Sequence, residues 1–185
     1  MTFGKKLVIL DRDGVINVDS DAFVKTPDEW VPIPGSLEAI ARLNQAGYRI
    51  AVASNQSGIG RGLFDMATLN AMHVKMNRAA AAVGGRIDAV FFCPHTAEDQ
   101  CECRKPKPGL LQSIIERFEI DPASTPVVGD ALRDLQAGAA LGFPTHLVLT
   151  GKGKKTLAAG GLPEGTKVHD DLKAFALTFL ASLSE

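Results

Sequence analysis

The sequence predicts an α/β fold, a three-layer Rossmann-like parallel sheet with helices on both faces. Three observations predict this fold. Short apolar runs alternate with helical patterns along the chain, which is typical of a parallel sheet covered on both sides. With 185 residues, 45% of them apolar, the chain is long enough for one sizeable core. No repeat, low-complexity segment or linker divides it, so we expect a single domain over residues 1–185.

Five short apolar runs have the length and composition of buried strands. They lie around residues 5–10 and at 48–54, 86–92, 125–130 and 145–150.

The segments between and after these strands show apolar residues at helical spacing. The expected helices span residues 37–46, about 65–82, 110–118, 132–142 and 170–183. Ser36 is the expected N-cap of the first and Asp170 of the last, while Gly47 and Gly142 mark helix ends.

Charge and composition exclude several classes of partner. The chain has 20 basic and 21 acidic residues and a net charge of -1, whereas nucleic-acid binders usually carry a basic patch. The N-terminal apolar stretch is too short for a signal peptide, which needs about 7–15 apolar residues, or for a membrane span. We therefore expect a cytoplasmic monomer with no nucleic-acid or membrane partner.

Polar residues stand where three of the predicted strands end. The first strand ends at Asp11, the second at Ser54 and the fourth at Asp130. In open parallel sheets, ligands bind outside the carboxyl ends of the strands. The sequence therefore predicts a site that brings these three side chains to one edge.

Closely spaced carboxylates at two strand ends predict a Mg²⁺ site. Asp11 and Asp13 are two residues apart, although an ordinary turn also explains them when they are taken alone. Asp130 ends a buried strand, where a carboxylate is costly without a cation. We expect Asp11, Asp130 and Asp13, the last through its carbonyl, to hold Mg²⁺. Asp134 lies either behind these ligands or on a helix surface.

Two further motifs suit an anionic ligand. Ser54 to Gly58 places hydroxyl, amide and backbone N–H groups after a strand, though a plain polar loop has the same composition. Arg104 to Gly109 places rigid cations at a helix start, where the backbone adds partial positive charge. A solvated basic cluster is the alternative reading of the second motif.

The three cysteines and one histidine form a compact cluster that predicts one zinc-binding loop. Cys93, His95, Cys101 and Cys103 supply three sulfurs and an imidazole, a full tetrahedral set for Zn²⁺. Because all four positions are filled by protein, the metal is expected to be structural and to fix the cations that follow. Three free buried cysteines beside a chance histidine is the alternative. The other histidines, at 73, 146 and 169, lack companions in the sequence.

The order of the motifs, DRDG, then SN, then K, then GDxxxD, resembles the haloacid dehalogenase-like phosphatases over essentially the whole chain. The resemblance implies that Asp11 is the nucleophile and Asp13 the general acid and base, with its pKa raised by neighbouring like charges. It implies that Ser54 and Lys105 stabilise the phosphoryl group and that Asp130 holds Mg²⁺. Many members carry a large cap, but no cap-sized insertion is present here.

Residues 11–17, DRDGVIN, and residues 93–109 resemble a narrower group, the phosphatases of heptose bisphosphates and of histidinol phosphate. The heptose resemblance implies a phosphorylated sugar substrate of lipopolysaccharide precursor synthesis, and a grip of Arg104 on a second phosphate. It also implies a sugar site lined by Asp19, Ser20, Asp21 and Ala22. Further expected substrate contacts are Arg12, Asn55, Gln56 and Ser57.

Other functions stay open at this point. A histidinol-phosphate phosphatase, a broad sugar phosphatase and a phosphotransferase fit the same motifs. A zinc-stabilised binding module without catalysis is the non-enzyme alternative, and a substitution at Asp11 or Asp13 would have been its signature.

Overall fold

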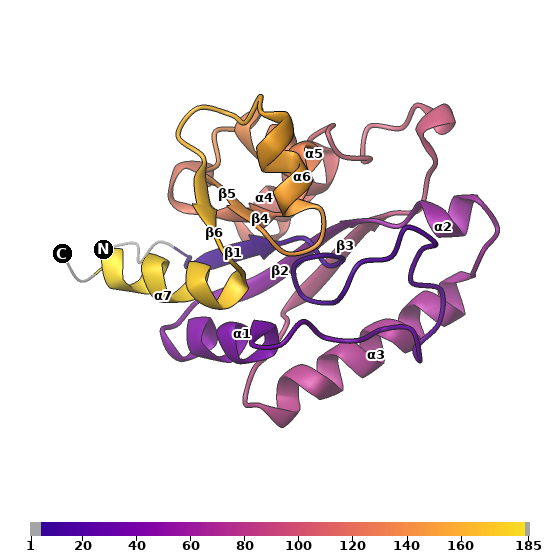
Figure 1. Ribbon diagram of the computed structural model, residues 1–185, viewed down its shortest axis with the longest axis horizontal. Helices are drawn as coiled ribbons and strands as arrows, with labels where there is room; N and C mark the ends of the chain where they lie inside the picture. The colour runs from indigo at the N-terminus through magenta and orange to yellow at the C-terminus, as the bar shows by residue number, and fades with distance from the viewer. Residues whose placement is uncertain (1–4, 184–185) are drawn as a thin grey trace.

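The computed structural model describes residues 5–183, and its centre is a six-stranded parallel sheet in the order β3-β2-β1-β4-β5-β6 (Figure 1). Every neighbouring pair of strands is parallel. The strands are β1 Leu7–Leu10, β2 Arg49–Asn55, β3 Ala89–Cys93, β4 Val127–Gly129, β5 Thr145–Val148 and β6 Lys167–His169. The predicted fold class is confirmed.

Helices cover both faces of this sheet. Those on one face are α1 Ser36–Gln45, α3 Met66–Ala82 and α7 Leu172–Ser182, which lie below the sheet in Figure 1. Those on the other face are α4 Gly109–Phe118 and α5 Leu132–Ala139. Shorter helical segments are α2 Ser57–Gly60, α6 Gly153–Ala159 and the 3₁₀ turns Ala97–Asp99 and Pro122–Ser124.

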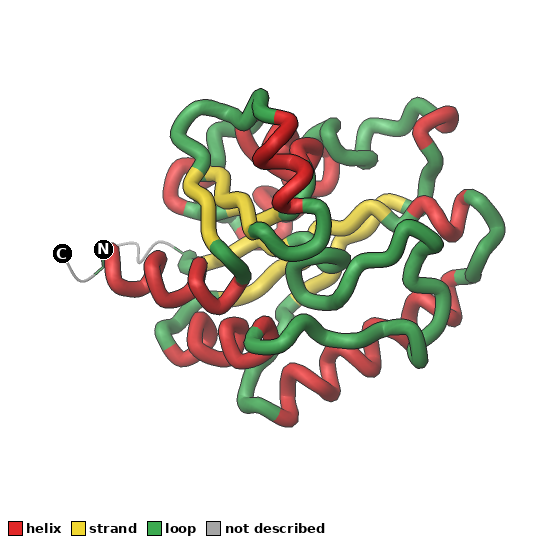
Figure 2. The backbone as a smooth tube through the Cα atoms, in the orientation of Figure 1, coloured by secondary structure: helices red, strands yellow, loops and turns green. Residues whose placement is uncertain are grey.

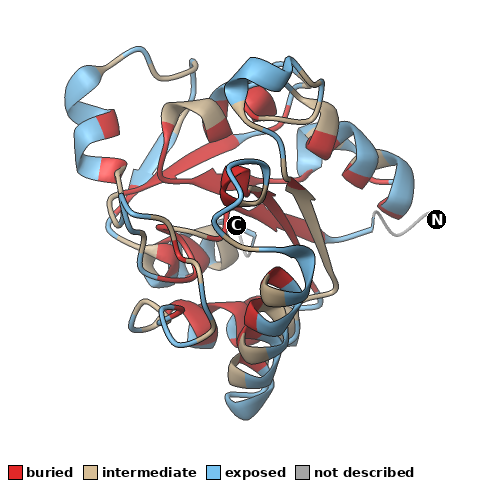
Figure 3. Ribbon diagram, turned by 90° about the vertical axis from the view of Figure 1, so that its right-hand side faces the viewer, coloured by how far each residue is buried: buried red, intermediate tan, exposed pale blue. Residues whose placement is uncertain are grey.

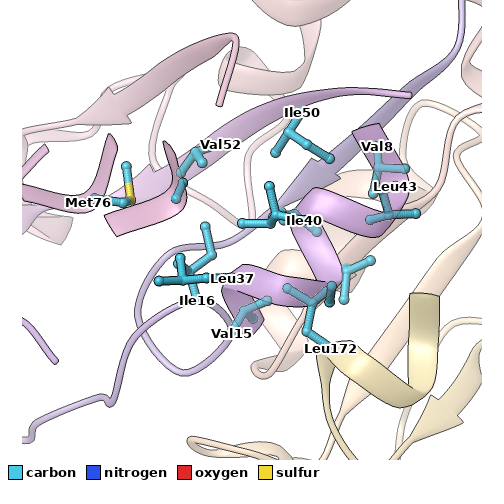
Figure 4. Packing of buried hydrophobic residues seen from close by; sticks show 14 of the residues in the cluster. Val8, Val15, Ile16, Leu37, Ile40, Leu43, Ile50, Val52, Met76 and Leu172 are labelled. Atoms are coloured by element: carbon cyan, nitrogen blue, oxygen red, sulfur yellow. The ribbon is translucent and has the colours of Figure 1, made fainter. Parts of the chain in front are cut away.

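The core consists of two apolar layers, one on each side of the sheet. Because successive strand residues point to opposite faces, Val8 and Leu10 of β1 belong to one layer and Leu7 and Ile9 to the other. Figure 4 shows the first layer, where Ile40 of α1 packs among side chains of the strands and of α7. The central strands β1, β2, β4 and β5 are accordingly buried, and the outer faces of the helices are exposed (Figure 3).

Besides the two 3₁₀ turns, one strand and two short helices were not predicted from the sequence. The strand β6 has only three residues, of which Lys167 and Val168 are exposed, so it lacks the apolar run of a buried strand. The helices α2 and α6 span four and seven residues, and both contain glycine. Elements this short carry too few turns for a periodic signal.

Two predicted helix caps are wrong by one residue. The N-cap of α1 is Gly35 in a left-handed conformation, and Ser36 instead donates its hydroxyl hydrogen to the carbonyl of Val15 at 2.8 Å. The cap of α7 is Asp171, whose carboxylate accepts from the backbone N–H of Ala174 at 2.7 Å. Adjacent aspartates are equal candidates in sequence, and only the backbone register separates them.

Two of the histidines that lack companions in the sequence form a pair in space. The Nδ1 atom of His146 lies 3.0 Å from Nε2 of His169, the two rings stack against each other, and both meet the ring of Phe175 edge-on. Burial, and the neighbouring His169, lower the pKa of His146 to about 3, so the pair is neutral at physiological pH. These residues are therefore part of the packing between β5, β6 and α7.

Within residues 5–183, no helix is both long and apolar enough to cross a membrane. The long loop between β1 and α1, green in Figure 2, approaches the β5–α6 loop: Thr150 donates to the carbonyl of Gly14 at 2.6 Å. Polar residues of both loops therefore reach the edge where the strands end.

Candidate active site

Three carboxylates meet at the ends of β1 and β4. Asp11 follows β1, Asp130 follows β4 and Asp134 lies in the first turn of α5, and one oxygen of each lies within 4.8 Å of the others. All three side chains are buried. The two strands are neighbours in register, with Leu10 opposite Val128, which places Asp11 and Asp130 side by side. The predicted convergence of these strand ends is thus found.

The carboxylate cluster has the electrostatics of a cation site. Burial and the nearby Asp134 raise the pKa of Asp11 to about 7, and burial together with Asp11 raises the pKa of Asp130 to about 8. Burial also disfavours ionised Asp134, but Lys105 and Arg133 outweigh it and hold its pKa below the usual value. A hard divalent cation with oxygen ligands would relieve the repulsion between Asp11 and Asp130. The side chains therefore fit Mg²⁺.

Lys105 links this cluster to the neighbouring strand. Its ammonium group is buried and lies 3.1 Å from Oδ1 of Asp11 and 2.7 Å from Oδ1 of Asp134, and it donates to the carbonyl of Ala53 at 2.6 Å. Asp134 therefore forms a buried ion pair with Lys105 and is not a surface residue.

The amide of Asn55 fixes the lysine backbone. Its Oδ1 accepts from the N–H of Lys105 and its Nδ2 donates to the carbonyl of the same residue, both at 3.0 Å. A reciprocal pair of this kind holds the β3–α4 loop against the end of β2. The side chain of Lys105 consequently enters the site from the β2 side.

Asp13 does not join the carboxylate cluster. Its oxygens accept from Arg12 at 2.9 Å, from Asn17 at 2.8 Å and from Gln56 at 2.9 Å. Burial raises the pKa of Asp13, but Arg12 and these hydrogen bonds outweigh it and lower the pKa below its usual value. The raised pKa expected from neighbouring like charges is therefore wrong for this arrangement, because the nearest charge is a cation.

Arg12 lies behind Asp13, away from the cavity. Its side chain is completely buried, and besides Asp13 its Nη1 lies 3.2 Å from Nε2 of His73 on α3. Since an arginine can only donate, the Nε2 atom of His73 accepts. The sequence did not show that Asp11 and Asp13 face the cavity while Arg12 points into the protein. The position of Arg12 therefore does not support the predicted contact with substrate.

Ser54 also lies one layer back from the cavity. Its hydroxyl accepts from Nε2 of Gln56 at 2.8 Å, and the same amide group donates to Asp13. Gln56 therefore stands between Ser54 and the open space of the site.

The site opens into a cavity of about 230 Å³. It is lined by polar and charged residues of several loops, among them the predicted Asp11, Asp13, Asp19, Ser20, Asp21, Asn55, Gln56, Ser57, Arg104 and Lys105. The predicted Arg12, Ala22, Ser54 and Asp130 do not line it, while Phe23, Val24, Arg61, Arg133 and Lys152 line it without having been predicted.

Two glycines make room for Asp130. A Cβ on Gly14 would lie 2.1 Å from Oδ2 of Asp130, and one on Gly151 would lie 2.2 Å from the same atom. Both residues have positive φ angles, +85° and +55°, which side-chain-bearing residues rarely adopt. The glycine after the aspartate pair is therefore required by the close approach of the Asp130 side chain to the loop after β1.

The predicted zinc ligands converge in the loop after β3. The Sγ atom of Cys103 lies 3.0 Å from that of Cys93 and 3.6 Å from that of Cys101, and 3.3 Å from Nδ1 of His95. Cysteine sulfurs about 2.3 Å and a histidine nitrogen about 2.0–2.1 Å from one Zn²⁺ would stand roughly 3.5–3.8 Å apart at the corners of a tetrahedron. The four side chains therefore fit a closed tetrahedral site for Zn²⁺.

The cysteine cluster is joined directly to the cavity. Arg104 follows Cys103, lines the cavity and donates from Nη1 to the carbonyl of His95 at 3.4 Å. Holding the four ligands together would fix both ends of the loop that carries Arg104 and Lys105.

Comparison with known proteins places the chain in a class. The sequence pattern of the haloacid dehalogenase-like hydrolases matches residues 5–142. The chain belongs to this family, whose motifs were recognised in the sequence.

Within the class, the relatives point to one activity. A D-glycero-β-D-manno-heptose-1,7-bisphosphate 7-phosphatase of Bordetella bronchiseptica is 62% identical over 171 residues, covering 92% of this chain and 96% of that protein. The enzyme of the same name from Pseudomonas aeruginosa is 52% identical over 176 residues, covering 95% and 98%. The crystal structure of the D,D-heptose 1,7-bisphosphate phosphatase of B. bronchiseptica, complexed with magnesium and phosphate, superimposes with a TM-score of 0.95 at 60% identity, covering 96% of this chain and 99% of that one.

Proposed function

We propose that this chain is a Mg²⁺-dependent phosphatase that removes the 7-phosphate of D-glycero-β-D-manno-heptose 1,7-bisphosphate. The observation that carries the proposal is the contact of Lys105 with Asp11 beside Asp130, in a cavity lined by cations. A carboxylate nucleophile, a phosphate-stabilising ammonium group and a metal ligand thus stand together. The named relatives support the choice of substrate.

The reaction divides into two displacements at Asp11. In the first, an Oδ atom of Asp11 attacks phosphorus and the bond to the sugar oxygen breaks, while Asp13 gives that oxygen a proton. In the second, Asp13 takes a proton from water, which attacks phosphorus and releases phosphate from Asp11. Lys105 neutralises charge on the phosphoryl oxygens in both steps. Asp13 is ionised in the free site, and a dianionic phosphate placed beside it would raise its pKa and supply the protonated form.

Mg²⁺ would be held by the carboxylates of Asp11 and Asp130, with the carbonyl of Asp13 as the third expected ligand. When bound, it supplies positive charge that draws the phosphate onto the nucleophile. Zn²⁺ would be held by the four side chains of the β3–α4 loop and would act on structure alone. We further propose that the chain acts as a monomer in the cytoplasm, where free thiols stay reduced.

The test of the substrate is a phosphate-release screen with purified protein and Mg²⁺. It should include both anomers of heptose 1,7-bisphosphate, sugar monophosphates and histidinol phosphate. The β-anomer of the bisphosphate should give the highest kcat/KM. A higher value for histidinol phosphate or for a monophosphate would reject the proposed substrate.

Arg104→Ala should reduce kcat/KM for the bisphosphate far more than for a sugar monophosphate. The guanidinium lines the cavity and, within residues 5–183, makes one long hydrogen bond, to the carbonyl of His95, so its other donors remain available to a second phosphate. A charge-assisted contact is worth about 1.5–3 kcal/mol, so the selective loss should be roughly tenfold or more.

The control for this variant is Arg117→Ala, which removes an exposed guanidinium from α4 outside the cavity and should leave both rates unchanged. Equal losses on both substrates for Arg104→Ala would remove the argument for a second phosphate.

The purified protein should contain about one Zn²⁺ per chain and should need added Mg²⁺ for turnover. Elemental analysis, followed by EDTA treatment and Mg²⁺ readdition, measures both. Cys93→Ser should abolish zinc retention, whereas His169→Asn, a change at a histidine outside the cluster, should retain it. Full activity without Mg²⁺ would contradict the predicted Mg²⁺ requirement, and wild-type protein free of zinc would contradict the predicted zinc site.

A further inference from the structure

Arg133 is a cavity-lining cation that the motifs do not explain. It lies in the first turn of α5, three residues after Asp130, and its side chain borders the same cavity as Asp11 and Lys105. Among the described residues, its guanidinium forms no hydrogen bond and no ion pair, and its Nε–H is buried without a partner. A buried charged donor without a hydrogen bond is unfavourable, because it has lost its hydrogen bonds to water and has no protein acceptor in their place.

The other cations of the cavity have protein partners. Lys105 contacts two carboxylates and a carbonyl, and Lys152 lies 3.4 Å from Asp19. Arg104 donates to a carbonyl, and Arg61 stands over the ring of Phe23 at 5.8 Å from its centre. Arg133 therefore differs from these neighbours in having a buried N–H group, its Nε–H, without a partner in the described part of the chain.

The charges around Arg133 are those of the reacting centre. Burial disfavours its charged form, but Asp134, Asp11, Asp130 and then Asp19 act in the opposite direction and raise its pKa further. The guanidinium thus stays charged, and Asp134, Asp11 and Asp130 stabilise its charge more than Asp19 does.

The two nearest cations approach Asp11 from opposite sides of β1. Lys105 is fixed against the end of β2 by Asn55, and Arg133 comes from the segment after β4, on the other side. A tetrahedral phosphate over Asp11 would present oxygens to both sides. A planar guanidinium can hold two of these oxygens at once.

We propose that Arg133 binds the phosphoryl group that is transferred to Asp11, from the β4 side and opposite to Lys105. This proposal names a further phosphate-binding residue for the proposed function. It rests on that function in one respect, that the cavity binds a phosphoryl group. It assigns Arg133 to the reacting phosphate, whereas Arg104 is assigned to the second one.

The test measures the binding of inorganic phosphate in the presence of Mg²⁺, by calorimetry, for wild type and Arg133→Met. The dissociation constant should rise by roughly tenfold or more, as expected for the loss of a charge-assisted paired contact. Arg78→Met, at an exposed position on α3, is the matched control and should bind phosphate as wild type does. Thermal unfolding of each variant shows whether the fold is retained.

The variant Arg133→Lys distinguishes a paired contact of the guanidinium with two phosphate oxygens from an effect of its positive charge alone. It keeps the positive charge beside Asp134 but cannot hold two oxygens in one plane, so it should recover only part of the phosphate affinity. Full recovery by lysine, or unchanged affinity in Arg133→Met, would overturn the proposal.

Kinetics give an independent readout. In Arg133→Met, kcat/KM should fall by a similar factor for the bisphosphate and for a monophosphate, whereas a loss confined to the bisphosphate would overturn the assignment to the reacting phosphate. A wild type that binds phosphate but does not hydrolyse the heptose bisphosphate would reject only the proposed substrate. One that binds no phosphate with Mg²⁺ would overturn both proposals.

Discussion

Asp11→Asn is expected to abolish phosphate release while leaving the protein folded. The amide keeps the shape of the side chain at the end of β1 but cannot attack phosphorus, and it removes one ligand for Mg²⁺. The carboxylate is buried beside two others, and burial with Asp134 already raises its pKa to about 7. Removing one of three clustered carboxylates lessens their mutual repulsion, which offsets the lost contact with Lys105.

The measurement is single-turnover and steady-state phosphate release, together with urea unfolding. Turnover should drop to background, and the unfolding midpoint should equal or exceed that of wild type. Asp170→Asn is the matched control, because this aspartate is exposed and Asp171 caps the adjoining helix. A near wild-type rate in Asp11→Asn would rule out the aspartyl-phosphate route.

The main convergence of the site was predictable because it follows from sheet topology. The predicted residues Asp11 and Asp130 follow β1 and β4, the predicted Ser54 lies near the end of β2, and β2, β1 and β4 are neighbours in the sheet. Any chain with this order of strands brings those ends together. The zinc ligands were predictable for a simpler reason, since four metal-binding side chains lie within eleven consecutive residues.

The directions of individual side chains were not predictable. Arg12 lies between two aspartates and was expected to contact substrate, but it points into the protein toward His73. That partner lies on α3, 61 residues away, and no local pattern links the two. The lowered pKa of Asp13 follows from the charge of Arg12 and from hydrogen bonds with Arg12, Asn17 and Gln56, and the sequence alone does not show these contacts.

The cavity-lining position of Arg133 was not predicted, because it depends on how α5 packs against the preceding strand β4. In the sequence it reads as one charged residue in the first turn of an amphipathic helix, a position that is commonly exposed. Only the packing of α5 against β4 turns its side chain toward the cavity. Lys152 was missed in the same way, since the short helix α6 that follows it gives no periodic signal.

Lys105→Met is expected to lower kcat/KM on every phosphate substrate by roughly 10²–10³-fold, as the loss of an oxyanion-stabilising donor does. It is also expected to destabilise the fold. The lysine side chain is 3% exposed and its ammonium group contacts both Asp11 and Asp134, so methionine would leave two buried carboxylates without this cation. Breaking a buried ion pair on one side costs about 3–5 kcal/mol.

Lys107→Met is the matched control for this change. Lys107 is two residues further along, but it is half exposed and pairs with exposed Glu102 at 2.9 Å, a contact that contributes little. The control should retain the rate and the unfolding free energy of wild type. To separate chemistry from folding, kcat is compared at a temperature where circular dichroism shows Lys105→Met to be folded. A folded Lys105→Met with a wild-type kcat would mean that the lysine only balances the charge of Asp11 and Asp134, and that the phosphoryl group is stabilised by other cations of the cavity.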